Sequence, residues 1–279
     1  MAGRALLPRK IINYFMLGVC ALGAGIAIIV VCLMLGYILA KGLSFISLDF
    51  IISESVPAGY EGGGMRNEII GTLILVVLGS LIAVPLGMLT GIFLSEFGSP
   101  KVAATVRFAA DVLAGVPSIV VGVFAYIVIV SQYGYSAFSA GAALSIIMIP
   151  VVARTTEESM RLVPGSLREA ALALGITRWR SVIFVAIPGA LTGIVSGIML
   201  GVARIAGETA PLLFTALGNN FSFEGLARPI SALPLQIYNY ALSSDKNWQE
   251  QAWAGAFLLV MIVLLISLAV RWMSRKGRA

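Results

Sequence analysis

The sequence predicts an all-α membrane protein that crosses the bilayer six times. Hydrophobic residues make up 59% of the 279-residue chain, charged residues make up only 11%, and the mean hydropathy is +0.99. Such a composition excludes a soluble globular domain. Six apolar runs are long enough to span a bilayer, at about 12–40, 68–95, 105–131, 137–154, 181–204 and 249–271.

Lysine and arginine residues predict the orientation of the chain. With both termini in the cytoplasm, 14 of the 19 lie inside, 4 lie outside, and Arg204 lies within the fifth span. This bias is typical of multi-pass proteins, so we expect both termini to be cytoplasmic. The inner residues are scattered over four segments, which argues against nucleic acid as a partner. They are Arg4, Arg9, Lys10, Lys101, Arg107, Arg154, Arg161, Arg168, Arg178, Arg180, Arg271, Arg275, Lys276 and Arg278, against Lys41, Arg66, Arg228 and Lys246 outside.

Missing residue types exclude several kinds of chemistry. The chain has no histidine, so histidine triads, histidine metal sites and imidazole proton relays are absent. Cys20 and Cys32 share one predicted helix at a separation of about 18 Å, too far apart for a disulfide. No lysine follows a glycine, so the phosphate-binding loop of an ATPase is missing. We therefore predict a protein that is not an enzyme and holds no metal.

The first half of the chain contains one predicted break within the membrane. After the first span, residues 41–67 form an outer loop that we interpret as flexible turns. The third span carries Arg107 and Asp111, whose i, i+4 spacing predicts an ion pair. Pro117 then removes a backbone donor, and Ser118 can bond the freed backbone, so we expect a kinked or broken helix. The alternative is a bend that serves packing only.

The fifth span combines a stripe of small residues with two charges. Gly201 ends a stripe that predicts a helix-packing seam, because small residues let a neighbouring helix approach closely. On a continued helix Arg204 and Glu208 lie within roughly 60° of Gly201. The apolar segment Leu212–Leu217 is too short to cross the membrane, so we expect it to be re-entrant or interfacial. The stripe consists of Gly189, Gly193, Gly197 and Gly201.

Arg204 carries the sharpest functional hypothesis. A charge inside a span costs several kcal/mol unless it is paired or hydrated, so it usually faces a pathway or a partner. One interpretation is a structural ion pair with Glu208. The other is a cationic point for an anionic substrate, where Glu208 keeps the anion from binding too tightly to leave.

A short helical loop is predicted between the fourth and fifth spans. Pro164 stops the preceding helix, and Ser166 with Glu169 has the spacing of a capping box that opens a new helix. Gly175 supplies a left-handed stop after two turns, and Thr177 can cap the next helix.

This loop resembles the cytoplasmic coupling loop of permease subunits in binding-protein-dependent ABC importers. That family's signature is Glu-Ala-Ala, three residues, Gly, nine residues, an aliphatic, one residue, an aliphatic and Pro. The resemblance implies the type I ABC importer permease fold and a coupling loop at 155–181. It also implies that a partner ATPase approaches the two alanines, with Arg168, Arg178 and Arg180 around the contact. The matching residues are Glu169-Ala170-Ala171, Gly175, Val185, Ile187 and Pro188.

Other motifs are similar to the A-type permease subunits of phosphate-specific transport systems. They are Gly71-Thr72-Leu73, 114–120 and 204–214, and the resemblance covers about 67–275. It separates an importer domain from residues 1–66 and from a tail at 276–279. It implies that Arg204 and Glu208 act in transport, and we add Pro117, Ser118 and Thr209 to the expected pathway.

The implied function is the permease subunit of an ATP-driven phosphate importer in the plasma (inner) membrane of a bacterium or archaeon. It would form half of the translocation path. The implied partners are a second homologous permease subunit, two copies of an ATPase subunit that bind ATP and Mg, an extracytoplasmic phosphate-binding protein and membrane lipid. The subunit itself would need no cofactor.

Two other transport functions stay open. A permease for molybdate, sulfate or another oxyanion is the main alternative, because one arginine does not distinguish tetrahedral anions. An ion-coupled secondary transporter is less favoured, because mid-membrane acids and internal repeats are not evident. An intramembrane enzyme is disfavoured by the lack of histidine, of a Ser-Lys pair and of paired aspartates in the spans.

Overall fold

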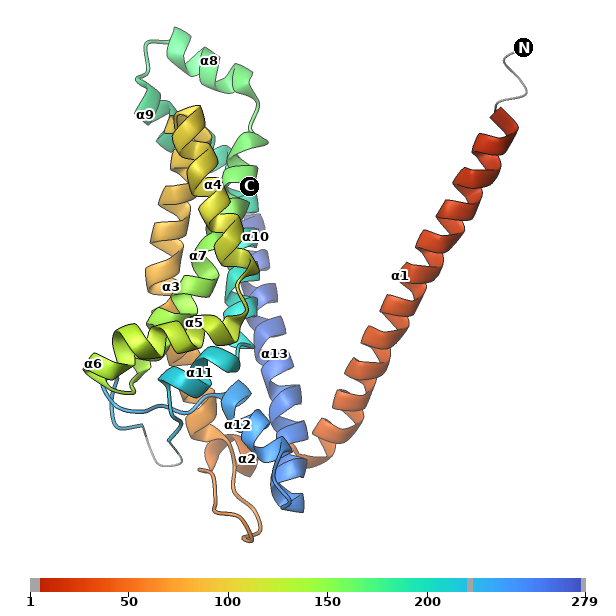
Figure 1. Ribbon diagram of the computed structural model, residues 1–279, viewed down its shortest axis with the longest axis vertical. Helices are drawn as coiled ribbons and strands as arrows, with labels where there is room; N and C mark the ends of the chain where they lie inside the picture. The colour runs from red at the N-terminus through yellow and green to blue at the C-terminus, as the bar shows by residue number, and fades with distance from the viewer. Residues whose placement is uncertain (1–5, 220–222, 277–279) are drawn as a thin grey trace.

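A computed structural model gives the structure of the protein and describes residues 6–219 and 223–276 (Figure 1). These residues are mostly helical, and their single β-type contact is an isolated bridge between Leu217 and Ile230. The helices are α1 (Leu6–Gly42), α2 (Leu48–Ile52), α3 (Arg66–Ile92), α4 (Pro100–Gly115), α5 (Ser118–Ala125), α6 (Ser131–Tyr133), α7 (Ala137–Arg161), α8 (Gly165–Ala173), α9 (Arg178–Ser181), α10 (Ile187–Ala206), α11 (Ala210–Thr215), α12 (Leu233–Ala241) and α13 (Lys246–Lys276).

Five helical segments of the described chain are long and apolar enough to cross a membrane. The third predicted span, 105–131, behaves differently, because α4 and α5 meet at an angle of 99°. Pro117 precedes α5 and adopts an extended backbone, so the predicted break is present as a sharp corner rather than a gentle kink. The five segments are Ile12–Phe45, Arg66–Phe97, Ala137–Arg161, Arg178–Ala206 and Lys246–Val270.

α7 is the central helix, and the glycine stripe of α10 packs against it. A Cβ atom placed on Gly193 or Gly197 would overlap the side chains of Ser159 or Thr155 of α7. A Cβ atom on Gly201 would lie 3.0 Å from Cγ of Met148. The two helices therefore approach each other too closely for any larger residue at these positions.

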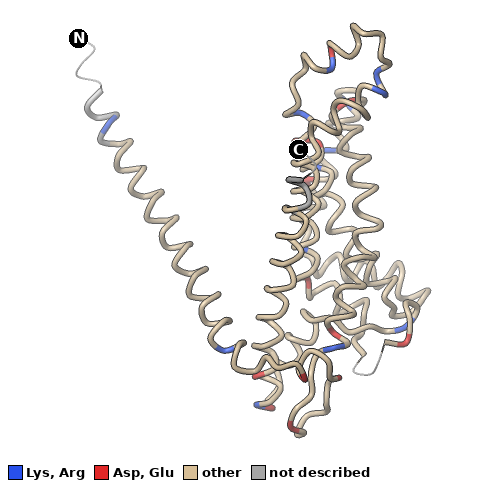
Figure 2. The backbone as a smooth tube through the Cα atoms, turned by 180° about the vertical axis from the view of Figure 1, so that it is seen from behind, with Lys and Arg blue, Asp and Glu red and all other residues tan. Residues whose placement is uncertain are grey.

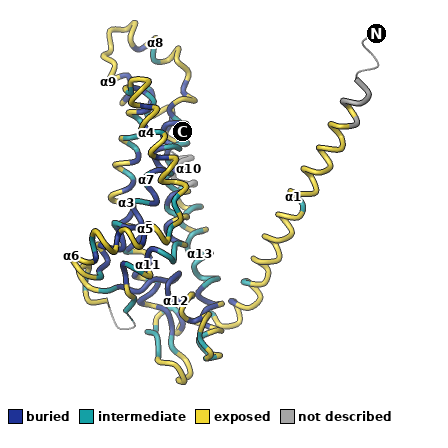
Figure 3. Tube along the Cα trace, in the orientation of Figure 1, coloured by how far each residue is buried: buried dark blue, intermediate teal, exposed yellow. Residues whose placement is uncertain are grey.

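α3 packs against another face of α7 in a similar way. A Cβ atom on Gly87 would lie 2.7 Å from Cβ of Val152, and one on Gly79 would lie 3.3 Å from Cβ of Leu144. The main apolar core forms where α3, α7 and α10 meet α11 and the segment 230–235. Figure 3 shows the buried residues gathered along this part of the molecule.

Figure 1 shows α8 and α9 at one end of the molecule, with the start of α1 and the end of α13 toward the same side. The segments around α2 and α12 lie at the opposite end. In Figure 2, basic residues lie along α8 and α9, whereas acidic residues gather mainly at the other end, together with a few basic ones. This distribution agrees with the expected placement of both termini on the side of the predicted coupling loop.

α1 leans away from the rest of the chain and is exposed along most of its length (Figures 1 and 3). It meets α13 near its C-terminal end, where the rings of Tyr37 and Trp253 lie edge to face with centroids 5.0 Å apart. Gly42 also lies close to Phe257. An apolar helix with this much exposed surface requires lipid or another chain around it.

Candidate functional site

A second membrane helix of the described chain, α10, is interrupted shortly after Arg204. α10 ends at Ala206, and the N–H groups of Gly207 and Glu208 bond back to the carbonyls of Arg204 and Ile205 in a tightened final turn. The expectation that Glu208 continues the helix is therefore wrong. Pro211 follows in the first turn of α11, where the absence of its N–H is tolerated.

Arg204 and Glu208 form a loose ion pair across this break. Nε of Arg204 lies 3.7 Å from Oε1 of Glu208, beyond hydrogen-bond range, and the Arg204 side chain is 38% exposed. By comparison, Arg107 and Glu157 approach to 2.6 Å, with the Glu157 side chain only 2% exposed. The Arg204 guanidinium therefore keeps donors that another anion can use.

The two broken spans meet beside this pair. α5 and α11 both run across the molecule in Figure 1, and a Cβ atom on Gly122 of α5 would lie 2.8 Å from Cα of Pro211. α11 is the short segment expected to be re-entrant or interfacial, although it already ends at Thr215. Ser118 is the first residue of α5, and Thr209 directly precedes α11; both are half-buried. Two hydroxyl-bearing residues thus stand at the starts of two neighbouring half-helices.

A network of charges joins α4 to α7 nearer the α8 end. Arg107 bonds Glu157 rather than Asp111, and Asp111 pairs with Arg154 at 3.2 Å. The predicted ion pair between Arg107 and Asp111 is therefore wrong. The reason is that both residues reach across to α7, where a buried carboxylate requires a cation more than an exposed neighbour does. Arg161 also bonds Glu157, at 2.7 Å.

α8 and α9 form a helical hairpin at the tip of the molecule. α8 begins at Gly165 after Pro164, without a side-chain capping bond, so the predicted capping box of Ser166 and Glu169 does not form. An extended Pro164 already starts the helix, which places Ser166 inside its first turn. Gly175 has a φ of +81°, as the predicted left-handed stop requires. Thr177 precedes α9 without a side-chain capping bond.

The two alanines of the hairpin differ in exposure, and two of its arginines bond the membrane part of the chain. Ala170 is exposed, whereas Ala171 is buried against the chain itself. Arg168 bonds the Glu96 carboxylate at 2.7 Å, and Arg178 donates to the backbone carbonyl of Glu96. Sequence patterns did not reveal Glu96, because it lies 72 residues before Arg168. These two arginines bind the hairpin to the membrane part of the chain.

The exposed surface of the hairpin is largely apolar. Leu167, Leu172 and Leu174 of α8 and its end are exposed, as is Trp179 of α9, over which the Arg180 guanidinium lies at 5.2 Å. Pro188 is exposed in the first turn of α10, and Glu169 is exposed on α8. Apolar side chains at a helical tip are typical of a docking surface for another protein.

The loop at the opposite end is held by hydrogen bonds, in contrast to the flexible turns that we expected at 41–67. Asp245 accepts bonds from the backbone N–H groups of Gly59, at 2.7 Å, and Trp248, at 3.1 Å. The N–H group of Trp248 contributes most to holding the pKa of this exposed carboxyl below its ordinary value, and that of Gly59 adds to it. The indole of Trp248 also donates to the carbonyl of Val56.

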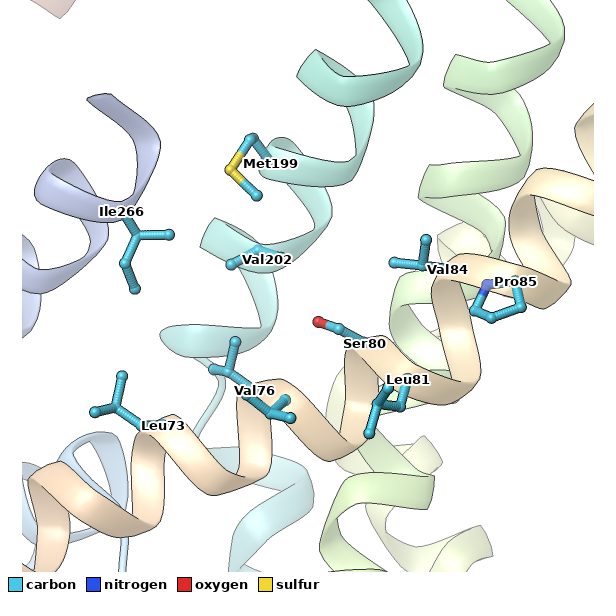
Figure 4. Close-up of a pocket in the computed structure, with 10 residues that line it drawn as sticks. Leu73, Val76, Ser80, Leu81, Val84, Pro85, Met199, Val202 and Ile266 are labelled. Carbon is cyan, nitrogen blue, oxygen red and sulfur yellow. The ribbon is translucent and has the colours of Figure 1, made fainter. Parts of the chain in front are cut away.

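The main apolar hollow lies away from the charged residues. It has a volume of about 480 Å³ between α3, α10 and α13, and its lining includes Val76, Leu81, Met199 and Ile266 (Figure 4). Ser80 is the only polar side chain in that lining. Such a groove suits lipid chains or an apolar helix rather than an anion. Among the described residues, no acidic or cysteine side chains gather closely enough to hold a metal ion.

The fold and site define a multi-pass membrane protein with two broken helices at its centre and, at one end, a helical hairpin whose exposed surface is largely apolar. The model of the family described as "Binding-protein-dependent transport system inner membrane component" matches residues 83–278. The chain therefore belongs to this family of inner-membrane transport components.

Curated relatives lie within the same family. The chain is 44% identical over 237 residues to "Phosphate transport system permease protein PstA" of Xylella fastidiosa (strain 9a5c), covering 84% of this chain and 82% of the relative. It is 41% identical over 265 residues to the protein of the same name from Pasteurella multocida (strain Pm70), covering 94% of each.

Solved structures show the same fold at low sequence identity. A bacterial ABC transporter involved in the import of the acidic polysaccharide alginate matches with a TM-score of 0.66 and 17% identity, over 97% of this chain and 98% of the other. The inward-facing MetNI methionine ABC transporter matches with a TM-score of 0.59 and 24% identity, over 76% and 94%. The predicted type I ABC importer permease fold is thereby confirmed.

Proposed function

We propose that this chain is the permease subunit of an ATP-driven importer of inorganic phosphate and forms half of its translocation path. The structural observation that carries the proposal is the loosely paired Arg204 at the break between α10 and α11. The names of the relatives that are 41% and 44% identical support phosphate as the anion.

A transport site must hold its substrate and then release it. A guanidinium matches two oxygens of a phosphate, and the competing Glu208 carboxylate keeps that interaction weak enough to reverse. Ser118 and Thr209 stand at the starts of the adjoining half-helices, and their hydroxyls are proposed to donate to the anion along the path. Pro117 contributes by fixing the corner from which α5 starts.

The hairpin is proposed to couple this path to a separate ATPase. Exposed Ala170, Leu172 and Leu174 offer a small, apolar surface for a groove of the partner. In the assembled importer, two ATPase copies bind ATP and Mg, and this subunit binds no cofactor. A second homologous permease subunit completes the path, and an extracytoplasmic phosphate-binding protein docks at the end that carries α2 and α12.

Uptake by the assembled complex in lipid vesicles tests the proposal. Arg204→Ala is expected to lower phosphate uptake at least roughly tenfold while the complex still assembles, since the loss of a charge-assisted pair is worth about 1.5–3 kcal/mol. Arg204→Lys should retain only part of the uptake, because an ammonium lacks the planar fork. Arg228→Ala is the matched control. It should transport normally, because Arg228 is exposed at the end of the molecule opposite the α8–α9 hairpin.

Two measurements separate this proposal from its alternatives. If Glu208 tunes release, Glu208→Gln complexes assemble normally, bind phosphate longer and turn over more slowly; if it only offsets charge, less protein is inserted. Unlabelled molybdate and sulfate should compete poorly with labelled phosphate. Full uptake by an assembled Arg204→Ala complex, or stronger competition by another oxyanion, would contradict the proposal.

A further inference from the structure

Glu96 lies where the hairpin meets the membrane part of the chain. It belongs to a π turn, Phe93–Phe97, that ends the long α3 segment, and the residue is only 9% exposed. π turns are rare and frequently mark functional positions. A buried carboxylate at such a turn requires a partner, and its partner here comes from the hairpin.

A single guanidinium joins three elements at this point. Arg168 of α8 donates from Nη2 to the Glu96 carboxylate and to the carbonyl of Met160, both at 2.7 Å, and from Nη1 to the carbonyl of Val163 at 2.8 Å. These bonds tie α8 to the end of α7 and to the π turn of α3. The planar guanidinium suits this junction, because it directs several donors from two nitrogens toward separate acceptors.

The other half of the hairpin reaches the same residue. Arg178 of α9 donates to the backbone carbonyl of Glu96, and its guanidinium lies 5.4 Å from the centre of the Phe97 ring. Both helices of the hairpin are therefore fastened to one turn of α3. A displacement of the hairpin must either pull on that turn or break these bonds.

α3 leads from this turn to the candidate transport site. It packs along α7, and at Gly79 a Cβ atom would lie 3.2 Å from Cδ1 of Ile205. Ile205 is buried and is the neighbour of Arg204. One continuous helix, with Pro85 inside it, thus connects the point of attachment of the hairpin with the break between α10 and α11.

We propose that Glu96 is a positioning residue that transmits movement of the α8–α9 hairpin through α3 to the break beside Arg204. The inference rests on the proposed coupling to an ATPase but not on phosphate as the substrate. The hydrogen bonds to Glu96 attach the hairpin directly to α3, in addition to the packing of α3 along α7.

Two cysteine probes in the assembled complex with its ATPase separate docking from transmission. Cys20→Ala and Cys32→Ala first remove the native thiols, which are exposed. Ser166→Cys, exposed on α8, reports docking through protection from a water-soluble maleimide. Gly207→Cys reports the break, because a Cβ atom there has room, with 3.9 Å to the nearest carbonyl oxygen, that of Arg204. Rates are compared with and without a non-hydrolysable ATP analogue.

In the otherwise unchanged complex, the analogue is expected to change the rate of labelling at Gly207→Cys at least about fivefold. This factor corresponds to the lower end of typical coupling free energies. Glu96→Ala should reduce that response to less than about twofold while Ser166→Cys stays protected. Glu158→Gln, an exposed carboxyl near the end of α7, is the matched control and should keep the full response. If Glu96→Ala does not assemble, Glu96→Gln and Arg168→Lys, which each keep part of the junction, should show a partial loss.

The outcomes distinguish the two proposals. A full response in assembled Glu96→Ala, or in both of the milder variants, overturns the role of Glu96. Loss of protection at Ser166→Cys together with loss of the response also overturns it, because Glu96 would then only hold the hairpin in shape. If the labelling rate of Gly207→Cys does not change with the ATP analogue in the complex that keeps Glu96, both this inference and the proposed coupling are overturned.

Discussion

Gly175 shows how one backbone angle sets the shape of the hairpin. Its φ of +81° lies in the left-handed region, and its N–H group bonds the carbonyl of Leu172 as α8 ends. A Cβ atom there meets nothing within 4 Å, so conformation rather than space selects glycine. The turn that separates α8 from α9 depends on this residue.

We predict that Gly175→Ala strains the turn by about 1–2 kcal/mol and lowers stimulation of the partner ATPase by substrate. Gly165→Ala is the matched control, because its Cβ atom also meets nothing within 4 Å and its φ is negative. Trypsin cleavage next to Arg178 and Arg180 should accelerate in Gly175→Ala only. Equal cleavage and equal ATPase stimulation in the two variants would show that the turn tolerates side chains.

Two arginines illustrate what residue patterns can and cannot reveal. Arg204 was predictable as functional, because a charge in an apolar span stands out whatever surrounds it. The inward direction of Arg168 was not predictable, since it depends on Glu96 and on carbonyls that only the fold brings together. The mistaken pairing of Arg107 with Asp111 has the same origin, because cross-helix partners outweigh neighbours on one helix when a carboxylate is buried.

At the scale of helices, close packing on α7 is the feature most sensitive to size. Gly197 faces Thr155 so closely that a Cβ atom would overlap it, and the helices must separate to admit a side chain. The same helices carry buried apolar residues that depend on their spacing, including Ile194 and Ile205.

Gly197→Val is predicted to destabilise the subunit by roughly 1–3 kcal/mol through overpacking. Gly23→Val in α1 is the matched control, because a Cβ atom there meets nothing within 4 Å. Thermal unfolding in detergent, followed by size-exclusion chromatography, should show a lower midpoint for Gly197→Val alone. A shared midpoint would mean that α7 and α10 are separated in solution.

Features of a helix were predictable from the sequence where residues close together in the chain determine them. The stripe at four-residue spacing in α10 was visible, and so was the break at Pro117. The partner of the stripe and the 99° corner were not, because they depend on packing between distant segments. The packing seam of α3 was not predicted, although Gly79, Ala83, Gly87 and Gly91 recur there at the same four-residue spacing. The end of α10 before Glu208 was missed because periodicity alone does not mark a helix stop.

For the whole molecule, the sidedness of the chain is the property that most needs measurement. The hairpin and the segments around α2 and α12 lie at opposite ends, and from the distribution of basic residues we expect the hairpin on the cytoplasmic side (Figure 2).

In the background without native cysteines, Ser244→Cys should react with an impermeant maleimide added outside intact cells. Ser166→Cys, in the subunit expressed without its ATPase, should react only after the membrane is opened. Both positions are exposed, so a difference in reactivity reports sidedness rather than burial. The reverse pattern would invert the whole topology, including the side on which the ATPase is expected.

The position of α7 between two glycine-lined helices has a consequence for the order of synthesis. α3 precedes α7 in the chain, but α10 follows it, so α7 enters the membrane before one of its two packing partners exists. Before α10 is synthesised, the polar residues on that side of α7 already have hydrogen-bond partners. Thr155 and Ser159 donate to carbonyls of their own helix at 2.8 and 2.6 Å. A hydroxyl already satisfied in this way tolerates lipid until α10 arrives, and the later seam closes without breaking any bond.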